Sequence, residues 1–110
     1  MKLIYAIVNR DDSKAVLTNL TKSGYYVTKL ATTGGFLGSG NTTFMICDDD
    51  EKVDDIVNII SKYSRKRRQT VPGDQTIIME GVTQPAVLPI EVTVGGATVI
   101  VTDVAKFMKL

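Results

Sequence analysis

The chain has 110 residues, 44% of them hydrophobic and 23% charged, which is typical of one soluble domain. A net charge of +1 provides no overall field toward nucleic acid or an anionic membrane, so neither is expected as a partner. The absence of histidine excludes Ser-His-Asp and Cys-His catalysis and every histidine metal site. We predict a single domain over residues 1–110 that holds no metal or resident cofactor.

The first third of the chain alternates strand and helix patterns. Lys2 to Val8 is apolar almost without interruption, which predicts a strand buried on both faces. Asp11 to Ser13 supply N-cap candidates, and Ala15 to Leu20 place apolar residues at helical spacing. Gly24 is typical of the position just after a helix. Tyr25 to Thr33 is rich in β-branched and aromatic residues and predicts a second strand.

The same alternation follows a glycine-rich loop. Thr42 to Cys47 predicts a third strand, and Asp48 to Glu51 open a second helix by capping it and complementing its dipole. The basic run Arg65 to Arg68 is expected in the last turn of that helix, or alternatively as a phosphate or RNA contact. The apolar stripe of this helix consists of Val53, Ile56, Val57, Ile60 and Tyr63.

The last third is predicted with less regular structure. Prolines and glycines from Gln69 to Pro89 indicate a long loop, with Ile77 to Met79 as a candidate short strand inside it. The remaining expected elements are strands at Ile90 to Val94 and Ala97 to Thr102, a tight hairpin turn at Gly95-Gly96, and a short helical tail at Val104 to Leu110.

This element order predicts an α+β fold. Two βαβ units plus an extra strand favour a ferredoxin-like split βαβ sandwich, an antiparallel sheet with two helices on one face. The helices leave the other face bare, whereas the first strand is apolar on both sides. We therefore expect self-association to cover the second face.

The short N-terminal run and the cysteine content predict the compartment. The apolar run ends at Asn9 with no small-residue cleavage site, so we expect a strand and not a signal peptide. Cys47 is the only cysteine, which excludes an internal disulfide and fits a reducing environment. We expect a cytoplasmic protein in which Cys47 is a small buried hydrophobe.

The glycine-rich loop from Thr32 to Thr43 carries the candidate chemistry. Four glycines within positions 34–40 let backbone N–H groups approach anionic oxygens. Phe36 offers a face for a purine ring, and Asn41 can match the N6/N7 edge of adenine. The pattern fits an adenine-nucleotide site, and equally a flexible hairpin loop with Phe36 and Leu37 in the core, because no P-loop or Rossmann fingerprint is present.

Longer motifs favour the nucleotide site. The run Thr28-Lys29-Leu30-Ala31-Thr32-Thr33-Gly34-Gly35-Phe36-Leu37, followed by Gly40-Asn41-Thr42-Thr43-Phe44, resembles the signature of the PII-like cyclic di-AMP receptor family. Further matches are Glu91 to Val99 and Ala6 to Val8, so the resemblance spans the chain. It implies a homotrimer that binds cyclic di-AMP between subunits and relays it to a downstream protein through rearrangement of the long loop. It implies no enzymatic activity.

The resemblance also implies a set of ligand contacts, at Thr28, Gly35, Phe36, Leu37 and Asn41. Gly24 and Tyr26 stand where many family members have asparagine and arginine, Gly38 where a basic residue is common, and Cys47 where glycine is common. Tyr26 is a sixth candidate, because its ring can stack on the second adenine.

Two alternatives remain open. One is a PII-like trimer that binds another adenine nucleotide. The other is a protein- or RNA-interaction module that uses Arg65 to Arg68 and the long loop. For the acidic run Asp48 to Glu51 we expect helix capping and not metal binding, because an EF-hand loop needs a central glycine and spaced ligands.

Overall fold

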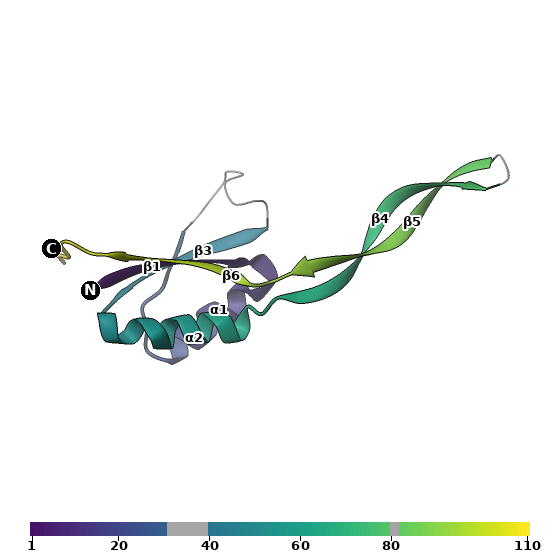
Figure 1. The fold of residues 1–110 in the computed structure, drawn as a ribbon. Helices are drawn as coiled ribbons and strands as arrows, with labels where there is room; N and C mark the ends of the chain where they lie inside the picture. The colour runs from purple at the N-terminus through teal and green to yellow at the C-terminus, as the bar shows by residue number, and fades with distance from the viewer. Residues whose placement is uncertain (31–39, 80–81) are drawn as a thin grey trace.

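Six strands, two α-helices and one short 3-10 helix form within the residues that the computed structural model describes, which are 1–30, 40–79 and 82–110. Figure 1 shows a body built from the sheet and helices and a long two-stranded projection. The elements are β1 (Lys2–Asn9), α1 (Arg10–Lys22), β2 (Thr28–Leu30), β3 (Asn41–Asp48), η1 (Asp50–Lys52), α2 (Val53–Tyr63), β4 (Arg67–Met79), β5 (Val82–Val94) and β6 (Ala97–Asp103).

Helix α1 begins earlier than its predicted caps, Asp11 to Ser13. Its N-cap is Asn9, whose side-chain oxygen accepts a hydrogen bond from the Asp11 backbone N–H at 2.8 Å. Asp11 to Ser13 therefore lie inside the helix, where the two carboxylates complement its dipole. The helix ends at Lys22 with Ser23 as its C-cap, and Gly24 follows with φ of 90°, as predicted.

Helix α2 differs from its prediction at both ends. It is preceded by η1, and the N-cap of η1, Asp49, makes no side-chain capping hydrogen bond. Asp50 instead pairs with the amino group of Met1 at 2.8 Å. Because α2 stops at Tyr63, the run Arg65 to Arg68 lies beyond the helix, and its assignment to the last helical turn is wrong.

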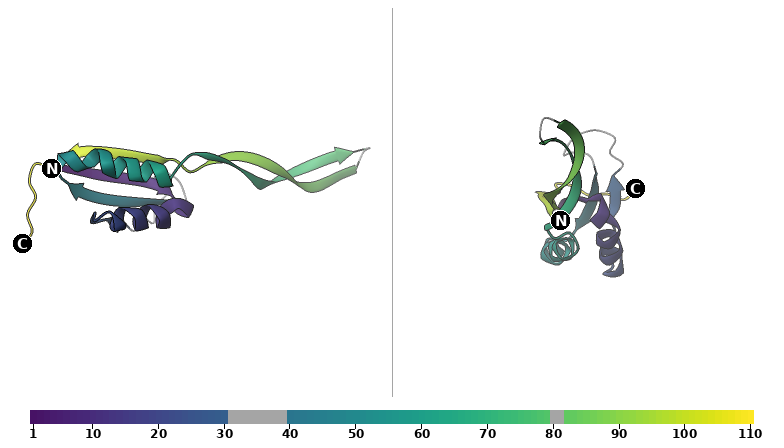
Figure 2. Two further views of the ribbon diagram at one scale, coloured as in Figure 1. Left: turned by 90° about the horizontal axis from the view of Figure 1, so that it is seen from below. Right: turned by 90° about the vertical axis from the view of Figure 1, so that its right-hand side faces the viewer.

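The body is a four-stranded antiparallel sheet in the order β2-β3-β1-β6, and both helices cover one face of it (Figures 1 and 2). Alternate residues of β1 and β3 face the helices, and each helix contributes an i, i+4 pair. The predicted antiparallel sheet with two helices is confirmed. The fully buried core consists of Ile4, Ala6, Val8, Val16, Leu20, Phe44, Ile46, Ile56 and Ile60.

The opposite side of the sheet, the helix-free face, is also apolar. In the strand register Tyr5 lies between Met45 of β3 and Ile100 of β6, and Leu3 lies beside Cys47. Met45 and Cys47 are half-buried, and Ile100 is exposed. Cys47 is therefore not a core residue, because it lies on the face that the helices do not cover.

The segment predicted as a loop at 69–89 is instead a two-stranded antiparallel ribbon, the arm, formed by β4 and β5. Pairing runs without a break from Arg67 opposite Val94 to Met79 opposite Val82. The arm raises the radius of gyration to 19.3 Å, whereas a compact chain of this length has about 13 Å. In a two-stranded ribbon both strands have an open edge, which tolerates the missing N–H of proline. The predicted strand at Ile77 to Met79 is part of β4.

Three further predictions are wrong. No tight hairpin joins β5 to β6 at Gly95-Gly96, because β5 pairs with β4 while β6 pairs with β1. Val104 to Leu110 contains no helix. The second strand begins at Thr28 and not at Tyr25, and its predicted end at Thr33 lies outside the described residues.

Candidate functional site

The structure places three of the six predicted ligand contacts. Asn41 opens β3 opposite Asn9 of β1, and Thr28 opens β2 opposite Met45. Tyr26 precedes β2 and is 91% exposed. The other three predicted contacts lie outside the described residues: Gly35, Phe36 and Leu37.

Thr28 and Asn41 share the helix-free face without meeting. Thr28 pairs with Met45, which lies four residues beyond Asn41 along β3. The two side chains are therefore separated by about 13 Å along the sheet. Asn41 lines a cavity.

That cavity, the Asn41 pocket, has a volume of about 290 Å³ at the end of the helix-free face. Neighbouring side chains on β1, β3 and β6 point to the same side of the sheet and form its floor. None of its lining residues is acidic. They are Ile7, Asn9, Asn41, Lys66, Gly95, Gly96, Ala97 and Thr98.

A second cavity of about 540 Å³ lies between the C-terminal half of α2 and the start of β6. Its apolar wall comes from Val57, Ile60 and Val99. It shares Lys66, Gly96 and Ala97 with the Asn41 pocket. These three residues therefore form the partition between the two cavities, at the point where the arm leaves the body.

Gly95 and Gly96 fit this junction because the chain passes itself closely there. Both have positive φ, 83° and 82°. A Cβ on Gly95 would clash with the carbonyl oxygen of Arg65, and one on Gly96 would come within 2.9 Å of Lys66 Cγ. Only glycine allows both the conformation and the approach.

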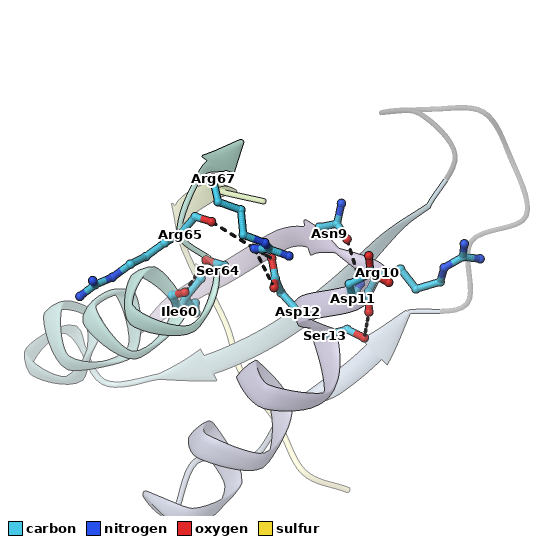
Figure 3. Close-up of polar contacts among 9 residues, drawn as sticks. All are labelled: Asn9, Arg10, Asp11, Asp12, Ser13, Ile60, Ser64, Arg65 and Arg67. Atoms are coloured by element: carbon cyan, nitrogen blue, oxygen red, sulfur yellow. Dashed lines mark hydrogen bonds and ion pairs between the residues drawn. The ribbon is translucent and has the colours of Figure 1, made fainter. Parts of the chain in front are cut away.

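The first turn of α1 connects the glycine-rich loop to this region. The Arg10 backbone N–H donates to the carbonyl of Gly40 at 2.7 Å, just after the undescribed segment ends. Asn9 caps the same turn and also lines the Asn41 pocket. The Ser13 hydroxyl donates to the carbonyl of Arg10 at 2.7 Å, and Figure 3 shows this bond beside the one between Asn9 and Asp11.

The same turn holds the base of the arm. Arg67 Nη1 lies 3.1 Å from an Asp12 carboxylate oxygen and also donates to the Arg65 carbonyl at 3.2 Å (Figure 3). The Asp12 side chain is 11% exposed, whereas that of Arg67 is 43% exposed. Poor hydration of Asp12 makes this pair stronger than an ordinary surface pair.

The basic run thus has divided roles. Arg67 pairs with Asp12, and Arg68 pairs with Glu91 at 3.2 Å across the arm. Lys66 lines the pocket, a placement that the sequence analysis missed. Lys66 lies between the end of a helix and the start of a strand, a position that could have marked it as a pocket residue. The sequence analysis instead assigned the whole basic run to the helix dipole.

Ionisable groups with shifted pKa values lie elsewhere in the body. The Tyr25 hydroxyl donates to Asp55, which together with desolvation raises the pKa of Tyr25 to about 12. The Met1 amino group has a raised pKa and Asp50 a lowered pKa because each hydrogen-bonds the other. In the described part of the chain no three histidine, cysteine or carboxylate side chains gather as metal ligands.

Comparison with known proteins identifies the family. A family model described as cyclic-di-AMP receptor matches residues 1–110. A crystal structure of a functionally unknown protein from Pediococcus pentosaceus ATCC 25745 is similar at 38% identity and a TM-score of 0.71, covering 99% of this chain and 96% of that one. Among the described helices, none is long and apolar enough to cross a membrane. The match over the full length shows that the chain belongs to the PII-like cyclic-di-AMP receptor family.

Proposed function

We propose that this protein is a cytoplasmic signal-transduction receptor, not an enzyme, that binds cyclic di-AMP between subunits of a homotrimer. The family match supports the receptor role. The observation that carries the placement of the ligand is the Asn41 pocket, because it opens on the helix-free face beside a residue predicted to contact adenine. Thr28, Gly35, Phe36, Leu37 and Tyr26 complete the proposed contacts.

The size of the pocket supports a site shared between subunits. Small-molecule pockets span about 300–1,000 Å³. At about 290 Å³ the Asn41 pocket holds one part of a dinucleotide and leaves the rest for a neighbouring surface. A second subunit on the helix-free face would enclose that remainder.

The fold supports the same assembly. The strand order β2-β3-β1-β6 with helices on one face is consistent with a ferredoxin-like sandwich. Tyr5, Met45 and Ile100 leave an apolar row on the helix-free face. Covering this row with two further copies removes apolar surface from water, which favours association.

The relay to a downstream protein would use the arm instead of a loop. The glycine-rich loop returns to the body at Gly40, which accepts the Arg10 N–H, and Asp12 in the same turn holds Arg67. A ligand that moves the loop would therefore strain the turn that anchors the arm. The arm is the element long enough to present a changed surface to a partner.

The alternative of an RNA-interaction module has less support. Arg67 and Arg68 are each paired with a carboxylate, which reduces the charge available for phosphate groups. Binding of another adenine nucleotide is the stronger competitor, because the exposed Tyr26 stands at a position where many family members have arginine.

Isothermal titration with cyclic di-AMP, cyclic di-GMP and ATP tests the ligand. We expect saturable heat with cyclic di-AMP and a large loss of affinity in N41A. The matched control is N58A, on the exposed surface of α2. If cyclic di-AMP gives no heat at high micromolar concentration while ATP does, the assigned ligand is wrong and ATP takes its place.

Light scattering after size-exclusion chromatography tests the assembly. A trimer has three times the chain mass of 12.0 kDa. The variant Y5E places a charge in the middle of the apolar row and should dissociate the trimer. A monomeric wild-type protein would contradict the shared site.

A further inference from the structure

Lys66 occupies a special position in the chain. It lies between the end of α2 at Tyr63 and the start of β4 at Arg67, and it lines both cavities. Its aliphatic stem lies across Gly96, so that a Cβ there would meet Cγ at 2.9 Å and Cε at 3.3 Å. The absence of a side chain on Gly96 therefore lets the lysine lie flat at the mouth of the Asn41 pocket.

Lys66 differs in its pairing from the basic residues that follow it. The neighbouring cations Arg67 and Arg68 pair with Asp12 and Glu91, but no carboxylate among the side chains that the structure describes pairs with Lys66. The residues lining the Asn41 pocket include no acid. The pocket thus has a net positive charge.

The other polar groups of the pocket suit the same kind of ligand. Asn41 and Thr98 contribute an amide and a hydroxyl, and Gly95 and Gly96 bring backbone close to the cavity. A cation beside such neutral hydrogen-bonding groups recognises the oxygens of a phosphate. It does not suit a cation or a purely apolar molecule.

We propose that Lys66 is a phosphate-binding residue of the Asn41 pocket and that, through it, a bound phosphodiester grips the base of the arm. The inference rests on the proposed function and names a residue that the sequence analysis did not. Because Lys66 directly precedes β4, its contact with a phosphate restrains the first residues of that strand. Arg67 is held by Asp12 from the other side, so the ligand and α1 would fix the arm base together.

Titration calorimetry with cyclic di-AMP on the full chain tests the contact. A hydrogen bond to a charged group contributes about 1.5–3 kcal/mol, so K66Q should raise Kd at least about tenfold. K66R keeps the charge and should bind nearly as well as wild type. The matched control is K52Q in η1, which removes the same charge far from the pocket and should leave Kd unchanged.

Two further measurements separate a charge contact from a structural one. The difference between wild type and K66Q should shrink at high salt, since salt screens an exposed cation. Cyclic di-AMP should slow amide hydrogen exchange at residues 67–70 in the wild type and not in K66Q. Thermal melting should show that K66Q remains folded. If K66Q is unfolded, the role of Lys66 is tested by comparing the affinities of wild type and K66R across salt concentrations.

The outcomes are distinguishable. Equal affinity of K66Q and wild type, with affinity lost in N41A, would overturn the role of Lys66 and leave the receptor function standing. Loss of affinity in K66R as severe as in K66Q would also overturn it, because charge would then not be what the ligand recognises. No binding of cyclic di-AMP by wild type would overturn both proposals.

Discussion

The body and the arm of this protein are stabilised in different ways. In the body, two helices and a four-stranded sheet bury nine fully enclosed side chains between them. In the arm, each strand has one neighbouring strand, and a lone two-stranded ribbon is marginally stable in water. The body is thus held by burial throughout, whereas the arm depends on the contacts at its base. The four predictions below test this difference, starting with the largest effect.

Removal of a core side chain should destabilise the body most. Phe44 lies on β3 with none of its surface exposed. F44A should lower the free energy of unfolding by about 3–5 kcal/mol, because it leaves a cavity that cannot collapse. Urea unfolding measures this, and F107A, in the exposed tail, should change almost nothing. Similar losses in both variants would mean that Phe44 is not part of a packed core.

The junction glycine should rank second. G24A and G95A both impose positive φ on alanine, which costs about 1–2 kcal/mol. G95A adds a clash with the carbonyl of Arg65, whereas the space around Gly24 is open. Thermal unfolding should therefore show a distinctly larger loss for G95A. Equal losses of stability in G24A and G95A would indicate that the chain near Arg65 shifts to accommodate the added Cβ.

The two ion pairs of the arm should differ in strength. Asp12 is 11% exposed, so loss of its pair with Arg67 in D12N should cost about 1–2 kcal/mol, between the values for surface and buried pairs. Arg68 and Glu91 are 77% and 64% exposed, and E91Q should cost less than about 0.5 kcal/mol. Double-mutant cycles with R67Q and R68Q isolate each coupling. A stronger coupling for Arg68 with Glu91 than for Arg67 with Asp12 would contradict the proposal that Asp12 anchors the arm.

The smallest effect concerns pH. Because hydrogen bonding to Asp55 raises the pKa of Tyr25 to about 12, the folded state favours its neutral form. The stabilisation is fully present below the ordinary tyrosine pKa near 10 and is lost as pH rises through 12. Ultraviolet titration should show a tyrosine transition near pH 12 that Y25F removes. Titration of Tyr25 near pH 10 would disprove the Tyr25–Asp55 bond.

The body was predictable because its signals are local. The i, i+4 pairs Val16 with Leu20 and Ile56 with Ile60 indicate helices that need a covering sheet, and they form the core. The family was predictable from the motifs in and around the glycine-rich loop, and it is confirmed. The role of that loop in binding a nucleotide stays a prediction. Of the proposed contacts that the structure describes, Asn41 lines a pocket.

The arm was not predictable in the same way. Pro72 and Pro89 read as loop signals because proline lacks a backbone donor, but the two residues sit opposite each other in a ribbon whose outer edges need no donor. Gly95-Gly96 predicted a hairpin turn because glycine readily takes positive φ. Both residues do have positive φ, but they do not form a hairpin turn. The local sequence does not determine which strands pair. In the structure β5 pairs with β4, and β6 pairs with β1.

By itself, then, the sequence determined the two helices, the strands of the body, the apolar second face of the sheet and the receptor family. These depend on periodicity and motif, which are properties of neighbouring residues. Only the tertiary structure decided that Lys66 borders the pocket of Asn41 and that Arg67 meets Asp12. The residues of these pairs are 25 and 55 positions apart in the sequence. Side chains so far apart come together only when the strands pair in their final order.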